Sequence, residues 1–405
     1  MSINRLFLIA LLFSMAAPDP VRAEEPRPSS SRHPTYNMIG RDAPAVSSPL
    51  NPNFVVSEEA HMREGGFWRS GYINENLVGL AVADIDRDGR NEVVYASEKN
   101  VWVTRFGGGS LAQLAKYSVP ATQRIASVDV FDVDGDGRLE IICSAQDENN
   151  APVSFVLKFN DSTLDPLAQR LPWYLRVVGQ GGGRFLAGQK AEASGARVFS
   201  GSVQNISLDG SKVASHGAVG LPEHVNLFNF VQGRLGSTGP LTAAVRFPSE
   251  HIFLYENKNR VWESREEYSG TMTYLAPQNH RDPGDRKREF LPARLLIADI
   301  DGDGQNELIV AKNDRGGVPF MSNQRGFTSG VIQAFKYQNL SLTPFFRTRT
   351  LPGAVVDIQL ADFKNNGTTS LVAAVLTQSK SGMLSEGLSL IVAYDISGRA
   401  PGPVE

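Results

Sequence analysis

The 405-residue sequence has a single cysteine, Cys143, so an internal disulfide cannot form. It has no basic excess, because its formal net charge is −3, and we therefore expect no nucleic-acid partner. Its six histidines show no zinc-site spacing, and no nucleophile-elbow or phosphate-loop motif occurs. Cys143 lies in an apolar run and is expected to be a buried free thiol. These absences remove the usual signatures of zinc enzymes, serine hydrolases and nucleotide-binding proteins.

Long apolar runs are also scarce, and the only candidate lies at the N-terminus. Residues 6–17 are apolar, but twelve residues are too few to cross a hydrocarbon core of roughly 30 Å. Arg5 precedes this run, and residues 21–23 offer the small residues of a cleavage site. We expect a signal peptide at residues 1–23, an exported chain that is periplasmic or extracellular, and no transmembrane span in the mature protein. Residues 24–52 are rich in Pro and Ser, which predicts a disordered linker.

Residues 53–400 consist of a repeated pattern of short apolar, β-branched runs separated by turns. These runs alternate with the period of strands and lack the period of helices, which predicts an all-β fold. Four strands recur about every 50 residues, which is typical of a β-propeller blade. We expect six blades, with the second ending in a strand at residues 173–178. The expected first strands are residues 77–85, 125–131, 185–188, 225–231, 295–300 and 355–360.

The last repeat lacks a fourth strand, and an N-terminal segment can supply it. Residues 67–70 (Phe-Trp-Arg-Ser) resemble the fourth-strand segments at residues 261–264 and 345–348. An N-terminal strand is therefore expected to close the ring, which would remove exposed sheet edges. Seven blades are the alternative if residues 53–58 and 271–275 belong to a further blade. A two-domain mixed fold would leave the repeats unexplained.

Three loops between expected first and second strands share the pattern Asp-x-Asp-x-Asp-Gly-x-x-Glu. Carboxylates at positions 1, 3 and 5 can turn around one point, the glycine allows a sharp bend, and position 7 can add its backbone carbonyl. Four carboxylates in one loop repel unless a cation compensates them, and hard oxygen donors favour Ca²⁺. The expected ligands at about three calcium sites are Asp84, Asp86, Asp88, Arg90 and Glu92; Asp132, Asp134, Asp136, Arg138 and Glu140; and Asp299, Asp301, Asp303, Gln305 and Glu307.

Two alternatives for these loops are acidic turns and EF-hands. Asp and Gly are common in turns, so a single acidic hairpin would be unremarkable, but three identical patterns favour metal. An EF-hand needs its bidentate Glu at position 12, where this chain has Tyr95, Cys143 and Val310. The flanking segments also read as strands, which excludes the helices of an EF-hand.

These motifs resemble those of the integrin α-type FG-GAP or VCBS repeat β-propellers, from about residue 67 to residue 395. The resemblance implies that the first-to-second-strand loops carry calcium on the residues given above. In the sixth repeat, Lys364 replaces an acidic ligand and could pair with Asp362, so we expect no calcium there. The third and fourth repeats have no carboxylate set.

The expected function is a calcium-binding module for protein or glycan interaction or scaffolding, monomeric unless it joins an envelope complex, and not an enzyme. Two insertions, residues 278–289 and 313–330, are the candidate binding loops. The alternative is a polysaccharide-active or redox enzyme with its site at the channel mouth. A lectin would need exposed aromatic side chains, whereas we expect the four tryptophans to pack in the outer strands.

Overall fold

The structure is a computed structural model that describes residues 66–179, 181–236, 239–278, 288–316, 325–378 and 387–396. All of them belong to one unit, Ser48–Glu405. The expected signal peptide (residues 1–23) and the expected linker (residues 24–52) lie outside the described residues. No helix within the described ranges has the length and apolar character to cross a membrane.

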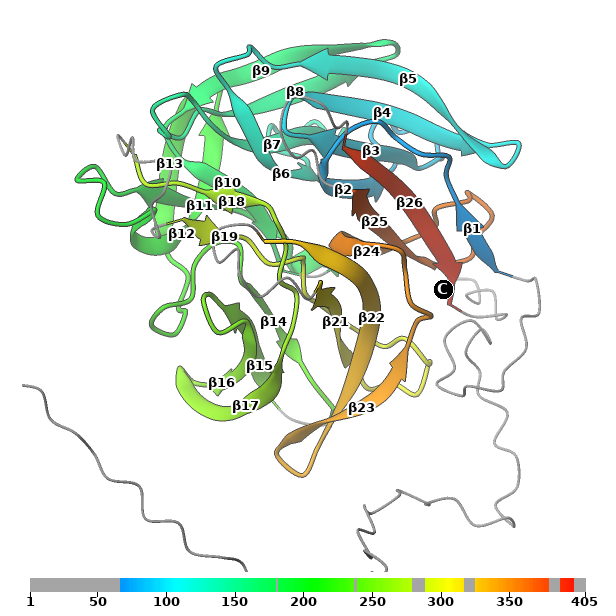
Figure 1. Ribbon diagram of the computed structural model, residues 1–405. Coiled ribbons are helices and arrows are strands. Elements are labelled where there is room, and N and C mark those ends of the chain that lie inside the picture. Colours follow the sequence, from blue (N-terminus) through cyan, green and yellow to red (C-terminus); the bar gives the residue numbers. More distant parts are fainter. Residues whose placement is uncertain are drawn as a thin grey trace, which may run out of the picture. The chain divides into compact units, whose positions relative to one another are not determined.

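Six sheets of four antiparallel strands form the blades of a propeller ring, which confirms the predicted fold (Figure 1). The first strands face the axis, and β2 contacts the first strands on both sides, β6 and β24. In five blades the strands follow chain order. These are β2 (Leu77–Ala83), β3 (Glu92–Ser97), β4 (Asn100–Gly107) and β5 (Ser110–Ser118); β6 (Arg124–Phe131), β7 (Glu140–Gln146), β8 (Ser154–Asn160) and β9 (Thr163–Leu171); β10 (Tyr174–Val178), β11 (Phe185–Ala191), β12 (Phe199–Asp209) and β13 (Lys212–Ala218); β14 (Phe230–Arg234), β15 (Pro240–Arg246), β16 (His251–Glu256) and β17 (Asn259–Glu267); and β20 (Leu296–Ala298), β21 (Glu307–Arg315), β22 (Phe327–Gln338) and β23 (Ser341–Arg347).

The sixth blade joins the two ends of the ring. Its sheet runs in the order β1-β26-β25-β24, so the N-terminal strand lies at the outer edge. The register pairs Phe67 with Tyr394 and Arg69 with Val392. This arrangement confirms the predicted closure by an N-terminal strand. The strands are β1 (Phe67–Arg69), β24 (Ala354–Ala361), β25 (Ser370–Gln378) and β26 (Leu388–Asp395).

Three predicted strand assignments were wrong. Residues 173–178 do not end the second blade, because β9 is its fourth strand and β10 opens the third. Residues 185–188 therefore belong to β11, the second strand of the third blade, and not to its first. β9 is mostly exposed and contains Pro166, so it does not read as a strand from sequence. The predicted strand at residues 225–231 is shorter, because β14 begins at Phe230. Before it, the Asn229 side chain accepts a bond from the Asn226 amide (2.9 Å), and the Asn226 side chain accepts one from the amide of Phe228 (3.0 Å), which forms a turn.

Residues 271–275 do not form a seventh blade. They include β18 (Tyr274–Leu275), which pairs only with β19 (Glu289–Phe290) in a two-stranded sheet. This connection between the fourth and fifth blades is tied to the second blade. The Gln146 side chain bonds the carbonyl of Ala276 (2.8 Å), and the Arg124 side chain bonds the carbonyl of Tyr274 (2.8 Å).

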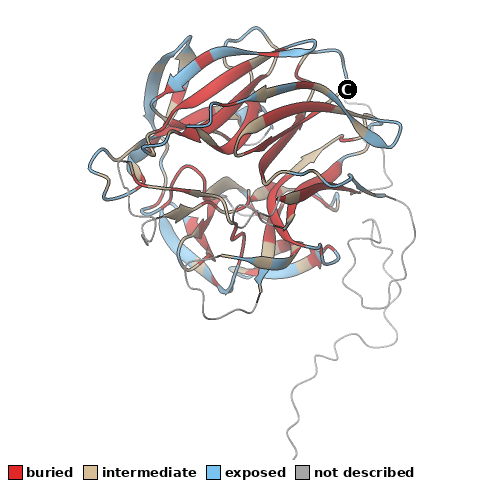
Figure 2. Ribbon diagram, turned by 45° about the horizontal axis from the view of Figure 1, so that its top comes forward, coloured by how far each residue is buried: buried red, intermediate tan, exposed pale blue. Residues whose placement is uncertain are grey.

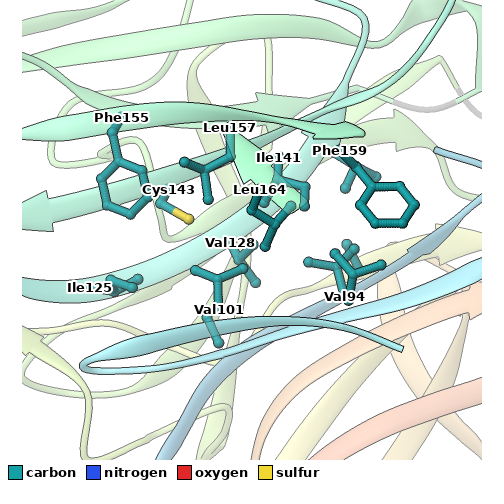
Figure 3. Close-up of a cluster of buried hydrophobic side chains, with 14 of the residues drawn as sticks. Val94, Val101, Ile125, Val128, Ile141, Cys143, Phe155, Leu157, Phe159 and Leu164 are labelled. Atoms are coloured by element: carbon teal, nitrogen blue, oxygen red, sulfur yellow. The ribbon is translucent and has the colours of Figure 1, made fainter. Parts of the chain in front are cut away.

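Apolar layers between neighbouring blades form the core. Between the first two blades, β3 and β4 contribute Val94 and Val101, which pack against Ile125, Ile141 and the rest of a buried cluster (Figure 3). Inner strands such as β3 are buried throughout, whereas outer strands alternate or are exposed (Figure 2). Cys143 is a buried free thiol, as predicted, and burial raises its pKa well above the usual value.

Candidate metal centres

The three acidic loops are residues 84–92, 132–140 and 299–307, numbered 1 to 9 within each loop. Each connects the first and second strands of its blade, in the first, second and fifth blades. The glycine at position 6 has a positive φ of 85° in Gly89, 85° in Gly137 and 87° in Gly304. A residue with a side chain is strained at such an angle, so the glycine is needed for the bend. The three loops therefore share one backbone shape.

The aspartate at position 1 holds this shape. Its Oδ2 accepts a hydrogen bond from the amide of the position-6 glycine, at 2.9 Å in each of the three loops. The aspartate at position 5 accepts a bond from the amide of position 7, at 2.9 Å from Arg90, 2.8 Å from Arg138 and 2.8 Å from Gln305. Both contacts are the local side-chain-to-backbone bonds that Asp makes in turns. They fix the aspartates of positions 1 and 5 within each loop.

The glutamate at position 9 is the first residue of the second strand and is fully buried in all three loops. Its Oε2 accepts a bond from the amide of position 2, at 3.1 Å from Ile85, 3.0 Å from Val133 and 3.1 Å from Ile300. Burial raises the pKa of Glu92 and Glu140 above the usual value, and raises that of Glu307 to about 7. A buried carboxylate with a raised pKa is short of compensating positive charge.

Three acidic groups in each loop present oxygens that lie within 4.8 Å of one another. The groups are Asp84, Asp86 and Glu92; Asp132, Asp134 and Asp136; and Asp299, Asp301 and Asp303. Calcium binds oxygens at roughly 2.3–2.6 Å, so any two of its ligands lie no more than about 5 Å apart. These clusters therefore fit a calcium ion in donor type and in spacing, and each could hold a metal ion.

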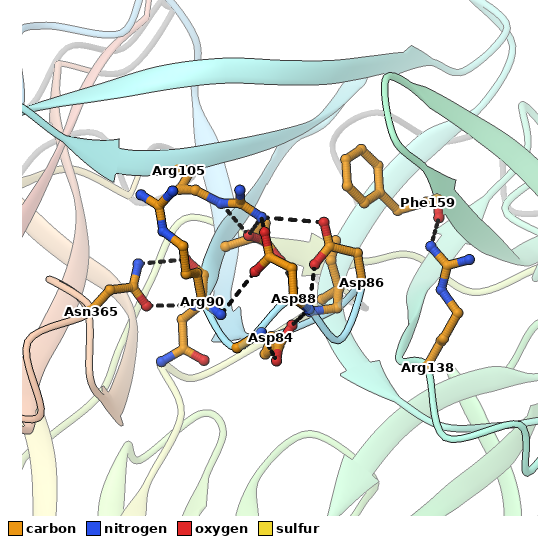
Figure 4. A network of polar contacts seen from close by, with 12 residues as sticks. Asp84, Asp86, Asp88, Arg90, Arg105, Arg138, Phe159 and Asn365 are labelled. Carbon is orange, nitrogen blue, oxygen red and sulfur yellow. Dashed lines mark hydrogen bonds and ion pairs between the residues drawn. The ribbon is translucent and has the colours of Figure 1, made fainter.

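A basic side chain from the third strand reaches each cluster, which the sequence reading missed. These strand cations are Arg105 on β4, Lys158 on β8 and Lys336 on β22. Arg105 bonds Glu92 through Nε (2.6 Å) and contacts Asp86 and Asp88 (Figure 4). Each strand cation stands opposite the buried glutamate in the sheet. Glu92 pairs with Arg105, and the adjacent pairs Ile141–Leu157 and Leu308–Phe335 set the same register in the other two blades.

The two lysines contact the aspartates more closely than the glutamate. Lys158 Nζ lies 3.0 Å from Asp134 and 2.5 Å from Asp136. Lys336 Nζ lies 2.7 Å from Asp301 and 2.6 Å from Asp303. These bonds lower the pKa of Asp136 and Asp303. The lysines therefore act as internal counter-charges on the side of positions 3 and 5.

The glutamates remain incompletely satisfied. Oε1 of Glu140 and Oε1 of Glu307 are buried and have no hydrogen-bond partner. The nearest lysine nitrogens are 3.6 Å and 3.9 Å away, beyond a normal hydrogen bond. Buried polar atoms are nearly always paired, and these two oxygens could serve as ligands of a cation.

The sixth-blade loop, residues 362–370, has the same backbone but a different charge pattern. Gly367 has a φ of 80°, and its amide bonds Asp362 Oδ2 at 2.8 Å. The sequence suggested that Lys364 at position 3 could pair with Asp362. Its Nζ lies instead 2.7 Å from Asp395 on β26. Asp395 pairs with Ser370, so it stands where the other three blades carry a strand cation.

The remaining two blades have no acidic set. The third-blade loop was expected near residue 187, but it follows β10 at Val178 and contains a 3-10 turn at Gly181–Gly183. Gly181–Gly183 therefore lie in the third-blade loop that corresponds to the acidic loops. In the fourth blade the loop follows β14, and part of it lies outside the described residues.

The prediction that the four tryptophans pack in outer strands was correct for two of them, Trp68 in β1 and Trp262 in β17; Trp102 lies in the third strand β4, and Trp173 precedes β10. Trp102 is buried, and the other three are partly buried. Trp68 donates to the carbonyl of Gly109 (2.7 Å), and Trp262 donates to the hydroxyl of Ser341 (3.1 Å). The described tryptophans do not form the exposed aromatic series that a lectin would need.

Comparison with known proteins identifies one repeat. Residues 84–143 match the family model of the FG-GAP-like repeat, and this stretch contains the first two acidic loops. No curated protein sequence matches the chain. Among solved structures, the WD40 domain of coronin from Toxoplasma gondii is similar with a TM-score of 0.36 and 10% identity, over 82% of this chain and 72% of that one. A likeness this distant says nothing about function.

Proposed function

Since its FG-GAP-like repeat and six-bladed ring fit an FG-GAP propeller family, we propose that this protein is an exported, calcium-stabilised propeller that serves as an interaction or scaffold module. A propeller with this type of repeat supports the role of an interaction or scaffold module. The acidic loops support calcium binding, because they supply hard oxygen donors in three of the six blades. The partner is a protein or a glycan. The three parts of the proposal, calcium, export and recognition, are tested separately.

The residues that would hold calcium are the carboxylates at positions 1, 3, 5 and 9 and the carbonyl of position 7, as the sequence predicted. Bound calcium would supply positive charge and cross-link the first and second strands of a blade. Because the unfolded chain does not assemble these oxygens, the binding free energy would stabilise the fold. At 100 times its dissociation constant, one ion adds roughly 2.7 kcal/mol.

One observation carries the calcium proposal. The buried Oε1 atoms of Glu140 and Glu307 lack hydrogen-bond partners beside aspartates that already converge. A turn that formed only because Asp and Gly favour turns would have no reason to bury an unsatisfied glutamate oxygen. A divalent cation among these carboxylates would satisfy both the oxygens and the excess negative charge.

Thermal unfolding with and without chelator tests the calcium proposal. We expect EDTA to lower the melting temperature, because up to three ions leave the folded state. Adding excess calcium should restore it, whereas magnesium should restore less, because it demands stricter octahedral geometry and retains its waters. An unchanged melting curve in EDTA, with no metal in the purified protein by elemental analysis, would refute structural calcium.

The recognition role rests on the shape of the fold and on its long connections. Residues 279–287 and 317–324 of the two candidate binding loops lie outside the described residues, so the role of these loops stays a prediction. A pull-down from envelope or secreted fractions tests it, with deletion of either loop as the comparison. Capture of the same partner by the intact protein and by both deletions would exclude these loops as the binding surface. Fractionation of cells that express the full chain tests export.

The rival function is an enzyme with its site at the channel mouth. A catalytic acid there would be expected to have a raised pKa. The channel acids Asp129 and Asp357 are instead paired with arginines; burial alone would raise the pKa of Asp129, but the charges of Arg176 and Arg294 lower it overall. This pairing favours the module over the enzyme.

A further inference from the structure

The first strands of four blades, β10, β14, β20 and β24, line a cavity of about 590 Å³. Val178, Ala298 and Leu360 line it, and they lie at or next to the ends of β10, β20 and β24. The cavity therefore opens toward the face on which the acidic loops begin. It adjoins the acidic loop of the fifth blade, because Asp299 and Asn306 contribute to its wall.

A network of paired charges forms one end of this cavity. Arg294 contacts Asp129 through Nη1 (2.7 Å) and Asp357 through Nε (3.0 Å), and Arg176 contacts Asp129 through Nε (3.1 Å). Both carboxylates also accept backbone amide bonds from the neighbouring blade, Asp129 from Val177 (3.1 Å) and Asp357 from Leu80 (3.0 Å). Arg176 and Arg294 also line a second, smaller cavity, so the network lies between the two. The two positive charges of its arginines equal the two negative charges of its aspartates.

Arg184 adds a third guanidinium without a matching acid. Its Nη2 donates to the carbonyl of Val130 (2.6 Å), and no carboxylate of the described residues lies within ion-pair distance of it. Asp299 lines the same cavity, but its oxygens accept bonds from the amides of Gly302 (2.7 Å) and Gly304 (2.9 Å). Burial lowers the pKa of Arg184, as expected for a positive charge with poor compensation.

The free donors of Arg184 suit an oxyanion. A guanidinium carries five N–H donors in a planar fork that matches a carboxylate or a phosphate, and the contact with Val130 occupies only one end of it. The wall also includes the apolar side chains of Val178, Leu227, Phe228 and Phe230. We propose that this cavity binds a small organic anion, with its carboxylate or phosphate on Arg184 and its apolar part against these side chains.

The test is a calorimetric titration of the full chain with phenyl phosphate and with benzoate at constant ionic strength. Inorganic phosphate and benzyl alcohol serve as half-ligands that carry only the oxyanion or only the apolar part. We expect saturable binding of at least one aromatic anion and weaker binding of both half-ligands. Arg184→Gln should weaken binding about tenfold or more, because charge-assisted hydrogen bonds are lost. Arg197→Gln, an exposed change in the same blade, should leave binding unchanged.

Two results would overturn the proposal. One is equal affinity of the wild type and Arg184→Gln for the anion that binds. The other is the absence of saturable binding of either aromatic anion. Because Arg184→Gln removes a partly buried charge that has no acidic partner, it should melt no lower than the wild type. If it fails to fold, Arg184→Lys replaces it: this variant keeps the charge but loses the fork, and unchanged affinity would likewise overturn the proposal.

Discussion

The fifth and sixth blades contain the same loop with its charges exchanged. In the fifth, Asp301 at position 3 faces Lys336 on the third strand; in the sixth, Lys364 at position 3 faces Asp395 on the third strand. The backbone is alike in both, since the amide of the position-6 glycine bonds the position-1 aspartate at 2.9 Å and 2.8 Å. The loop shape therefore needs the first aspartate and the glycine. The additional carboxylates, found in three blades, are not needed for this loop shape.

This comparison also indicates what the strand cations do. In the sixth blade one lysine and one aspartate neutralise each other, and Ser370 takes the place of the buried glutamate, donating to Asp395 at 2.8 Å. In the fifth blade a single lysine contacts three of the four loop carboxylates, so negative charge remains. A strand cation can support the loop without metal, and it would compete with metal for the same oxygens.

The largest effect on calcium binding should come from removing the buried negative charge of Glu307 in the fifth blade. Glu307→Gln can keep the bond from the Ile300 amide while replacing one charged oxygen with an amide donor to the nearby aspartates. We expect calcium stoichiometry to fall from three to two, with a loss of roughly 2.7 kcal/mol at calcium 100 times above its dissociation constant. In EDTA the melting temperature should not fall. Calorimetric titration and thermal unfolding measure both quantities.

Its matched control is Ser370→Ala in the sixth blade. This change removes one hydrogen bond, to Asp395, at a cost of roughly 1 kcal/mol. It should leave the calcium stoichiometry unchanged. A loss of bound calcium in this control, or a full set of three ions in Glu307→Gln, would contradict the assignment.

An intermediate effect should follow from reversing the exchange. The triple change Lys364→Asp, Ser370→Glu and Asp395→Lys gives the sixth-blade loop the charge pattern of the fifth. Because the loop backbone already matches, we expect one additional calcium per chain, measured by calorimetry and elemental analysis. The single change Lys364→Asp places two acids together and should destabilise the blade in EDTA. If the triple variant folds and still binds the wild-type number of ions, loop charge does not determine occupancy.

The smallest effect should come from removing one strand cation. Lys336→Met leaves the carboxylates of the fifth blade without their competitor, so calcium should bind about fivefold more tightly, or about 1 kcal/mol. The same variant should melt lower than the wild type in EDTA, because the acidic cluster is then uncompensated. The expected signature is tighter calcium binding together with a lower melting temperature in EDTA. Lower calcium affinity in Lys336→Met would show that the lysine assists binding.

Sequence was sufficient where the determinants are local. The nine positions of an acidic loop are adjacent in the chain, so their acidic side chains and their glycine could be recognised directly. The closing strand was found because Phe67 and Trp68 repeat the composition of other fourth strands. The outer strand β9 escaped notice because exposed outer strands need no alternation of apolar residues.

The strand cations could not be found from sequence, because they depend on register across two strands. Arg105, Lys158 and Lys336 lie 19, 24 and 35 residues from their aspartates at position 3. The differences arise from hairpins of unequal length, above all the insertion between β21 and β22. A fixed spacing does not reveal such a pair. Nor could the cavity be predicted, since Arg176, Arg184 and Arg294 meet only when the ring is closed.

The pairing of β1 with β26 has a consequence for how the chain folds. Gln378 and Leu388 pair across a short hairpin, whereas Phe67 and Tyr394 come from opposite ends of the ring. Loop-closure entropy grows by about 0.6 kcal/mol for each doubling of loop length, so joining the ends of an otherwise unfolded chain costs roughly 3 kcal/mol more than closing that hairpin. A three-residue strand cannot repay this cost before the other blades have formed. We expect β1 to join last, so a chain still emerging from the ribosome would be an open arc until its final strand is made.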